Sequence, residues 1–241
     1  MFGGFFDMDK PGWRWIGKIP EIVILSFFWC LCCLPIVTII PSCCALFDAV
    51  SRNTMLDDKG SFTRFFRTFW RELKQGIPLT LLWLGVFVVA LLSDGVVLYI
   101  SETYPELAFL SIVFRIMMIL LIPYLSWLVA LQSRYHNTFI GLHINAFRLY
   151  FGKLPSTFLL LLITALVLLV TFAHPYTYIL FVAAPAVIAI LHCVVIEKVF
   201  IVLFPGDYIE GLPVYSPEQR ASAQMIADAK REEAAAQEEE E

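Results

Sequence analysis

The chain has 241 residues, of which 59% are hydrophobic and 16% are charged, and its formal net charge at pH 7 is -4. Soluble domains carry roughly half apolar and a quarter charged residues, so this composition excludes an ordinary soluble core. Its long apolar runs indicate an all-α, polytopic helical membrane protein. Because the acidic residues gather in the C-terminal tail and the basic ones between apolar runs, no nucleic-acid partner is expected.

The first apolar segment, residues 22–46, is broken by Pro35 and Pro41. A straight span needs about 20 apolar residues, and proline interrupts a helix by removing a backbone donor. Thr38 and Ser42 are placed to bond backbone groups that such a break frees. The segment crosses the membrane once, is re-entrant, or crosses twice. We favour the hairpin forms, which put the N-terminus on the cytoplasmic side.

Residues 61–75 predict an amphipathic helix on the cytoplasmic membrane surface, ended by Gly76 and Pro78. Aromatic residues recur at i, i+3, i+4, i+7 and i+8, and basic residues take the other face. On an anionic leaflet, each such cation contributes about 1 kcal/mol. We therefore interpret this surface as a membrane-contacting or partner-binding face. Its residues are Phe62, Phe65, Phe66, Phe69, Trp70, Arg64, Arg67 and Arg71.

Four further apolar runs bring the expected number of spans to about five. Asp94 and Arg115 lie in the second and third spans, at similar depth if these form a tight helical hairpin, so they can pair. Charges within a bilayer are costly and usually face the bundle interior or a wet cavity. The pair is either a structural ion pair near the outer surface or part of a substrate or proton site. The four runs are 77–100, 107–131, 156–173 and 176–204.

Residues 134–152 mix aromatic, aliphatic and basic side chains and predict a second helix on the cytoplasmic surface. His136 and His143 would share a face of that helix. Because no carboxylate or cysteine lies nearby in the sequence, we expect headgroup contact there and no metal site. We expect residues 1–204 to form a single helical membrane domain and residues 205–241 to form a polar, acidic cytoplasmic tail.

Lysine and arginine alternate between the connecting segments from residue 45 onward. There are six in residues 45–76, none in 101–106 and three in 132–156. Cytoplasmic loops carry the excess of positive charge, so 45–76, 132–156 and the C-terminus are expected in the cytoplasm.

Several motifs carry a resemblance to a known family. They are Pro11-Gly12-Trp13-Arg14, WCLCCLPIVTI over 29–39 and GSFTRFFRTFWRELKQG over 60–76. In these the chain resembles the YesL family of bacterial membrane proteins, itself of unknown function. The resemblance implies a multi-pass protein of a bacterial plasma membrane. Since genes of that family often neighbour carbohydrate ABC importers, it also implies an accessory role in carbohydrate uptake.

The sequence lacks a recognisable catalytic constellation. Its four histidines are scattered, and it has no Ser-His-Asp spacing, glycine-rich phosphate loop or HExxH motif. We expect a non-enzymatic protein without a cofactor, with the lipid bilayer and ABC importer permease subunits as partners. The alternatives are an independent small-solute transporter or channel that uses Asp94 and Arg115, and a membrane enzyme.

Overall fold

The structure is a computed structural model that describes residues 11–56, 60–135, 138–173, 183–209, 212–213, 221 and 224–229. Over these residues the all-α prediction is confirmed, apart from a two-residue antiparallel pairing of β1 (Tyr208–Ile209) with β2 (Leu212–Pro213). The described helices include five that are long and apolar enough to cross a membrane. The α-helices are α1 (Pro11–Cys33), α2 (Ile39–Leu56), α3 (Ser61–Ser101), α4 (Ala108–Arg134), α5 (Phe139–Gly152), α6 (Leu154–Phe172) and α7 (Ala184–Leu203).

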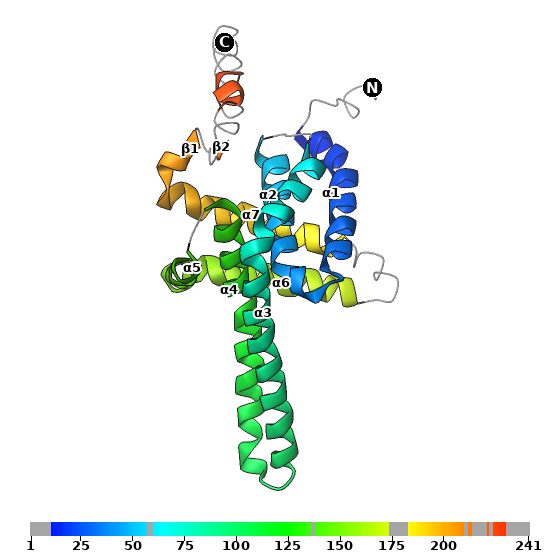
Figure 1. The fold of residues 1–241 in the computed structure, drawn as a ribbon, viewed down its shortest axis with the longest axis vertical. Helices are drawn as coiled ribbons and strands as arrows, with labels where there is room; N and C mark the ends of the chain where they lie inside the picture. The colour runs from blue at the N-terminus through cyan, green and yellow to red at the C-terminus, as the bar shows by residue number, and fades with distance from the viewer. Residues whose placement is uncertain are drawn as a thin grey trace, which may run out of the picture.

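The first apolar segment is broken where the sequence predicts. α1 ends just before Pro35, and a short 3₁₀ helix, η1 (Ile36–Thr38), leads into α2. The Thr38 hydroxyl donates to the backbone carbonyl of Cys32 at 2.5 Å, and the Ser42 hydroxyl donates to that of Thr38 at 2.7 Å. α1 and α2 form a helical hairpin, so the start of α1 and the end of α2 lie at the same end of the bundle (Figure 1).

α2 is the central helix of the bundle. It packs against α1, α3, α4 and α7. Of the apolar stretch Ile36–Asn53, which includes most of α2, 67% is buried, whereas only 6% of the most apolar stretch of α3 is buried. We predicted one broken span over 22–46. In the structure the second arm is long enough to cross, whereas the first arm, Val23–Cys33, is a shorter apolar helix. Polar residues on α2 therefore meet other helices rather than lipid.

α3 is longer than predicted. The expected surface helix and the span after it form one helix of 41 residues that contains Pro78, so the prediction that this helix ends at Gly76 is wrong. Gly76 instead allows a close crossing of α2, because a Cβ there would lie 2.5 Å from Pro41 Cγ. At the same crossing, the Thr80 hydroxyl accepts from the Ile40 amide at 3.2 Å, which satisfies a first-turn amide of α2.

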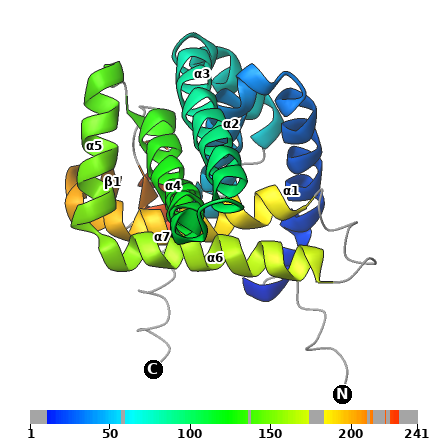
Figure 2. The same cartoon turned by 90° about the horizontal axis from the view of Figure 1, so that it is seen from below.

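α3 and α4 form a long antiparallel hairpin whose outer half projects from the rest of the bundle (Figure 1). A 3₁₀ helix, η2 (Pro105–Leu107), lies in the connection between them. α6 and α7 lie across the direction of α3 and α4, as the view along that hairpin shows (Figure 2). The helices that are apolar enough to cross a membrane therefore do not all run parallel to one another.

The second predicted surface helix starts later than expected. α5 begins at Phe139, and the Thr138 hydroxyl caps it by accepting from the Gly141 amide at 3.2 Å. Arg134, which we placed in this helix, is the last residue of α4. His136 lies outside the described residues, as do residues 174–182 of the predicted last turn and span. After α7 the chain continues through η4 (Pro205–Asp207).

Candidate functional site

The structure brings Asp94 and Arg115 together on α3 and α4. Arg115 Nε lies 3.3 Å from Asp94 Oδ2. The hydroxyl of Ser111, one turn before Arg115, donates to the other carboxylate oxygen. The Asp94 side chain is 13% exposed, whereas that of Arg115 is 56% exposed. The two helices therefore enclose the carboxylate, while the guanidinium reaches beyond them.

Asp94 lies seven residues before the end of α3 and Arg115 lies seven residues after the start of α4. The pair therefore belongs to the outer half of the hairpin, where no other helix in the described part of the chain accompanies these two (Figure 1). α3 continues from Asp94 to Ser101, a length of about 10 Å at 1.5 Å per residue. The apolar core of a bilayer is about 30 Å thick. A hairpin that reaches the far surface at its tip would thus hold the pair inside the apolar layer.

The predicted interfacial face on the first half of α3 is largely occupied within the chain. Phe65 is 1% exposed and packs in a cluster with residues of α1 and α2. The rings of Phe62 and Phe66 meet Phe28 of α1 edge-on, with centroids 5.6 and 5.5 Å away. Trp70, in contrast, is 70% exposed. Part of this face therefore packs against α1 and α2, whereas contact of its exposed residues with the membrane or with a partner stays a prediction.

The remaining residues of that face also include both packed and exposed side chains. Phe69 stacks on Phe65 with 6.4 Å between ring centroids. Arg71 turns toward α4, where its Nη2 donates to the Ser133 carbonyl at 3.2 Å. Arg67 is exposed and Arg64 is half-buried.

A buried polar layer, which we did not predict, crosses the bundle between α2, α3, α4 and α7. It contains three acidic residues, and each pairs with an arginine. The best enclosed pair joins Arg134 Nη2 to Glu197 Oε1, with side chains that are 2% and 1% exposed. The residues of the polar layer are Asp48, Ser51, Arg52, Thr68, Arg71, Glu72, Gln132, Arg134 and Glu197.

Aromatic and hydroxyl groups complete the Arg134–Glu197 pair. The Ser51 hydroxyl donates to Glu197 Oε1 at 3.0 Å, and Arg134 Nη2 lies 2.9 Å from the same hydroxyl oxygen. The Arg134 guanidinium also lies over the rings of Phe47 and Phe200, 5.1 and 5.2 Å from their centroids. Arg134 was expected at the membrane surface, and that expectation is wrong.

The other two acidic residues of the polar layer are held in a similar way. Glu72 accepts from Arg71 Nε at 2.7 Å and from Gln132 Nε2 at 2.6 Å. Asp48 accepts from Arg52 Nε at 2.9 Å and from the Thr68 hydroxyl at 2.7 Å. The bonds of Thr68 to Asp48 and of Gln132 to Glu72 join α3 to α2 and α4 to α3. No cluster of three or more His, Cys, Asp or Glu placed for a metal occurs among the described residues.

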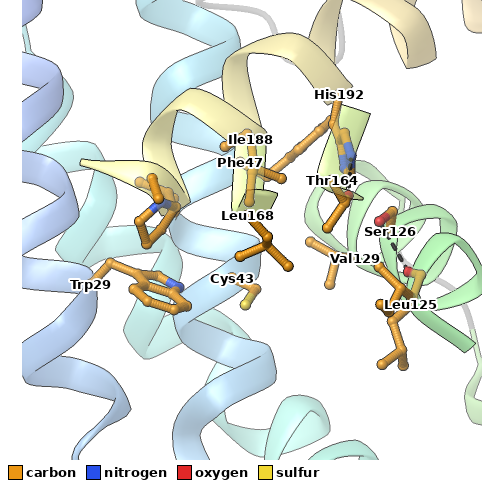
Figure 3. A pocket seen from close by; sticks show the side chains of 15 residues that line it. Trp29, Cys43, Phe47, Leu125, Ser126, Val129, Thr164, Leu168, Ile188 and His192 are labelled. Atoms are coloured by element: carbon orange, nitrogen blue, oxygen red, sulfur yellow. Dashed lines mark hydrogen bonds between the residues drawn. The ribbon is translucent and has the colours of Figure 1, made fainter. Parts of the chain in front are cut away.

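An apolar cavity of about 340 Å³ lies between α1, α2, α4, α6 and α7 (Figure 3). His192 is among its few polar lining residues. Its Nε2 lies 3.1 Å from the Leu160 carbonyl and 3.0 Å from the Thr164 hydroxyl. Because a carbonyl can only accept, the ring proton is assigned to Nε2. Neither Asp94 nor Arg115 lines this cavity.

One comparison with known proteins finds a match. Residues 22–93 match the model of a family described as "Protein of unknown function, DUF624". No curated protein and no solved structure matches the chain. The matched stretch covers the apolar end of α1, all of α2 and most of α3. It contains the Pro41 and Gly76 crossing, and it ends one residue before Asp94.

Proposed function

We propose that this chain is a non-enzymatic integral membrane protein that acts by binding another membrane protein through the outer half of the α3–α4 hairpin. The observation that carries the proposal is the exposed Arg115 guanidinium on an otherwise apolar pair of helices. The resemblance to the YesL family suggests the partner: the permease subunits of a carbohydrate ABC importer in a bacterial plasma membrane.

Arg115 supports a protein partner because lipid is a poor environment for it. The apolar side chains of the hairpin can face acyl chains without penalty. A guanidinium at this depth is costly unless it pairs or reaches an aqueous surface. Asp94 accepts hydrogen bonds from Ser111 and from Arg115 Nε, and the Arg115 side chain is 56% exposed, which leaves room for a partner at its other N–H donors. A partner helix that offers a carboxylate, amide or carbonyl at this level would accept those hydrogen bonds.

The same geometry disfavours the independent transporter. A pathway through one chain would need Asp94 and Arg115 to line an enclosed space. They lie instead between two helices, and the cavity of the bundle is lined by other residues. The enzyme alternative gains no support either, because the acidic residues of the polar layer are engaged by arginines.

We also propose a cytoplasmic location for both termini. α1 and α2 form a hairpin, so the start of α1 lies at the same end as the end of α2, where the connection to α3 begins (Figure 1). That connection belongs to the segment richest in lysine and arginine, whereas the α3–α4 connection has none. The positive-inside rule then puts the former in the cytoplasm and the latter outside.

The test is affinity purification of the tagged full chain from its native host in a mild detergent, followed by mass spectrometry. Importer permease subunits should accompany the wild-type protein in stoichiometric amounts. Arg115→Ala should reduce their recovery about tenfold, the loss expected for a charged hydrogen bond. Leu169→Ala is the control, since Leu169 is a 67% exposed uncharged residue of α6, outside the hairpin, and it should leave recovery unchanged.

Two other outcomes would overturn the proposal. Abundant, well-folded protein recovered alone would favour an independent transporter, and solute uptake by the Asp94→Asn and Arg115→Ala variants would then be measured. If each single variant lowers membrane abundance and the double variant restores it, the pair is structural and does not bind a partner.

A further inference from the structure

The cavity between α1, α2, α4, α6 and α7 has no role in the proposed function. Its volume of about 340 Å³ is more than twice that of an apolar cavity of about 150 Å³ that binds benzene. Small side chains, Cys43 on α2 and Ala184 and Ala189 on α7, leave this space open where larger ones would fill it (Figure 3). Protein interiors are normally close-packed, so a space of this size can accommodate a ligand.

Water is a poor occupant because it needs two to four polar partners. The hydroxyl groups of the lining are already engaged within the protein. Ser126 donates to the Ile122 carbonyl at 3.1 Å, and Thr164 donates to the Leu160 carbonyl at 3.0 Å. His192 Nε2 is engaged with that carbonyl as well. The space is therefore suited to an apolar group.

The helices that line the cavity indicate where an apolar occupant would come from. Four of the five helices that line the cavity, α2, α4, α6 and α7, are long and apolar enough to cross a membrane. Fatty acyl chains are the medium around such helices, and the cavity is partly open to its surroundings. An acyl chain that enters from the bilayer exchanges one apolar environment for another and fills the void.

One polar atom of the lining adds chemical specificity. Trp29 Nε1 is buried and has no oxygen or nitrogen acceptor; its polar neighbour is the Cys43 thiol. The indole lines the cavity beside Cys43 (Figure 3), whose thiol is only a weak acceptor. A buried indole N–H usually finds an acceptor. The ester carbonyl at the head of a phospholipid acyl chain is an acceptor of this kind.

We infer that this cavity binds one acyl chain of a membrane phospholipid, with Trp29 Nε1 donating to the ester carbonyl of that chain. The bound lipid links α1 and α2 to α4, α6 and α7 and occupies space that these helices leave unfilled. The site is independent of Arg115 and of the hairpin, so its test does not depend on the proposed function.

The test uses the full chain in vesicles of phosphatidylethanolamine and phosphatidylglycerol, with a diazirine in one acyl chain of the phosphatidylglycerol. After irradiation, peptide mass spectrometry should find adducts at Val129 in the cavity and at Val89 on the exposed hairpin. Cys43→Phe fills the cavity and should lower the Val129 adduct at least fivefold without changing the Val89 adduct. Cys30→Phe, the same change outside the cavity lining, should leave both unchanged.

A second pair of variants tests the hydrogen bond. Trp29→Phe should lower retention of the labelled lipid during detergent exchange about fivefold, the ratio expected for one hydrogen bond. Trp83→Phe is the matched control, because Trp83 Nε1 is also buried without a partner but lies outside the cavity lining. Equal retention by the Trp29 and Trp83 variants would refute the role of Trp29.

Absence of a Val129 adduct in the wild type, or an unchanged adduct in folded Cys43→Phe, would overturn the site. If Cys43→Phe does not fold, Ile188→Phe fills the same cavity from α7 and should give the same loss. Excess unlabelled palmitic acid should not compete with the labelled phospholipid. Competition would identify a free fatty acid as the occupant and refute the phospholipid assignment.

Discussion

Replacing Arg134 with methionine should destabilise the bundle strongly. Methionine keeps much of the side-chain length and the apolar contact with the rings of Phe47 and Phe200, but it removes the charge that pairs with Glu197. That carboxylate is 1% exposed and keeps the Ser51 hydroxyl at 3.0 Å. Removing one partner of a buried pair costs about 3–5 kcal/mol, because an uncompensated charge remains buried.

The free energy of unfolding can be measured by titrating the protein in mild detergent micelles with sodium dodecyl sulfate and following tryptophan fluorescence. Arg115→Met is the matched control, since it makes the same change in an ion pair whose arginine is 56% exposed, and it should cost far less. The double variant Arg134→Met with Glu197→Leu should recover most of the loss, because it removes both charges. A loss for Arg134→Met no larger than for Arg115→Met would refute this reasoning.

Three further predictions concern the packing of α3 and the orientation of the chain in the membrane. Gly76→Ala should lower the free energy of unfolding by about 1–3 kcal/mol, because the new methyl group overlaps the ring of Pro41 on α2. Gly95→Ala, in open space, should raise it by up to about 1 kcal/mol. Equal effects of the two variants in the same titration would contradict the close crossing of α2 and α3. Phe65→Ala should lower the free energy of unfolding by about 3–5 kcal/mol, and Trp70→Ala should change it by no more than about 0.5 kcal/mol. The reverse order would contradict the packing of Phe65 against α1 and α2. A cysteine at Thr103 should react with an impermeant thiol reagent on intact cells, while an N-terminal cysteine should react only after the cells are opened; labelling of both on intact cells would refute the shared side of the N-terminus and the α2–α3 connection.

Local chemistry predicted the break in the first segment, because the effect of Pro35 on a helix does not depend on its neighbours. The continuity of α3 was not predictable in this way. Gly76 and Pro78 are typical of a helix end, but here Gly76 is required by the approach of Pro41 from another helix. A glycine at a helix crossing and a glycine at a helix end have the same local pattern, and tertiary packing decides between them.

The Asp94–Arg115 and Arg134–Glu197 ion pairs also differ in how far the sequence could predict them. Asp94 and Arg115 were paired from the sequence because a short connection between two helices sets their relative depth. Arg134 and Glu197 lie 63 residues apart, and no periodicity relates α4 to α7. The sequence does contain one indication of buried polar contacts, which is an acidic residue within an apolar run. Glu197 and Asp48 each interrupt such a run, and an acidic residue there usually has a partner on another helix.

The most direct test of the partner-binding role is site-specific photo-crosslinking in native membranes, with benzoylphenylalanine at Ile112. Ile112 lies on α4 one turn from Arg115 and is 60% exposed. Phe147 on α5, 57% exposed, provides the control position. A crosslink from Ile112 to an importer permease subunit, absent from Phe147 and lost with Arg115→Ala, is the expected result. Crosslinks from Ile112 only to lipid, or only to a second copy of the chain, would contradict the proposed role of the hairpin.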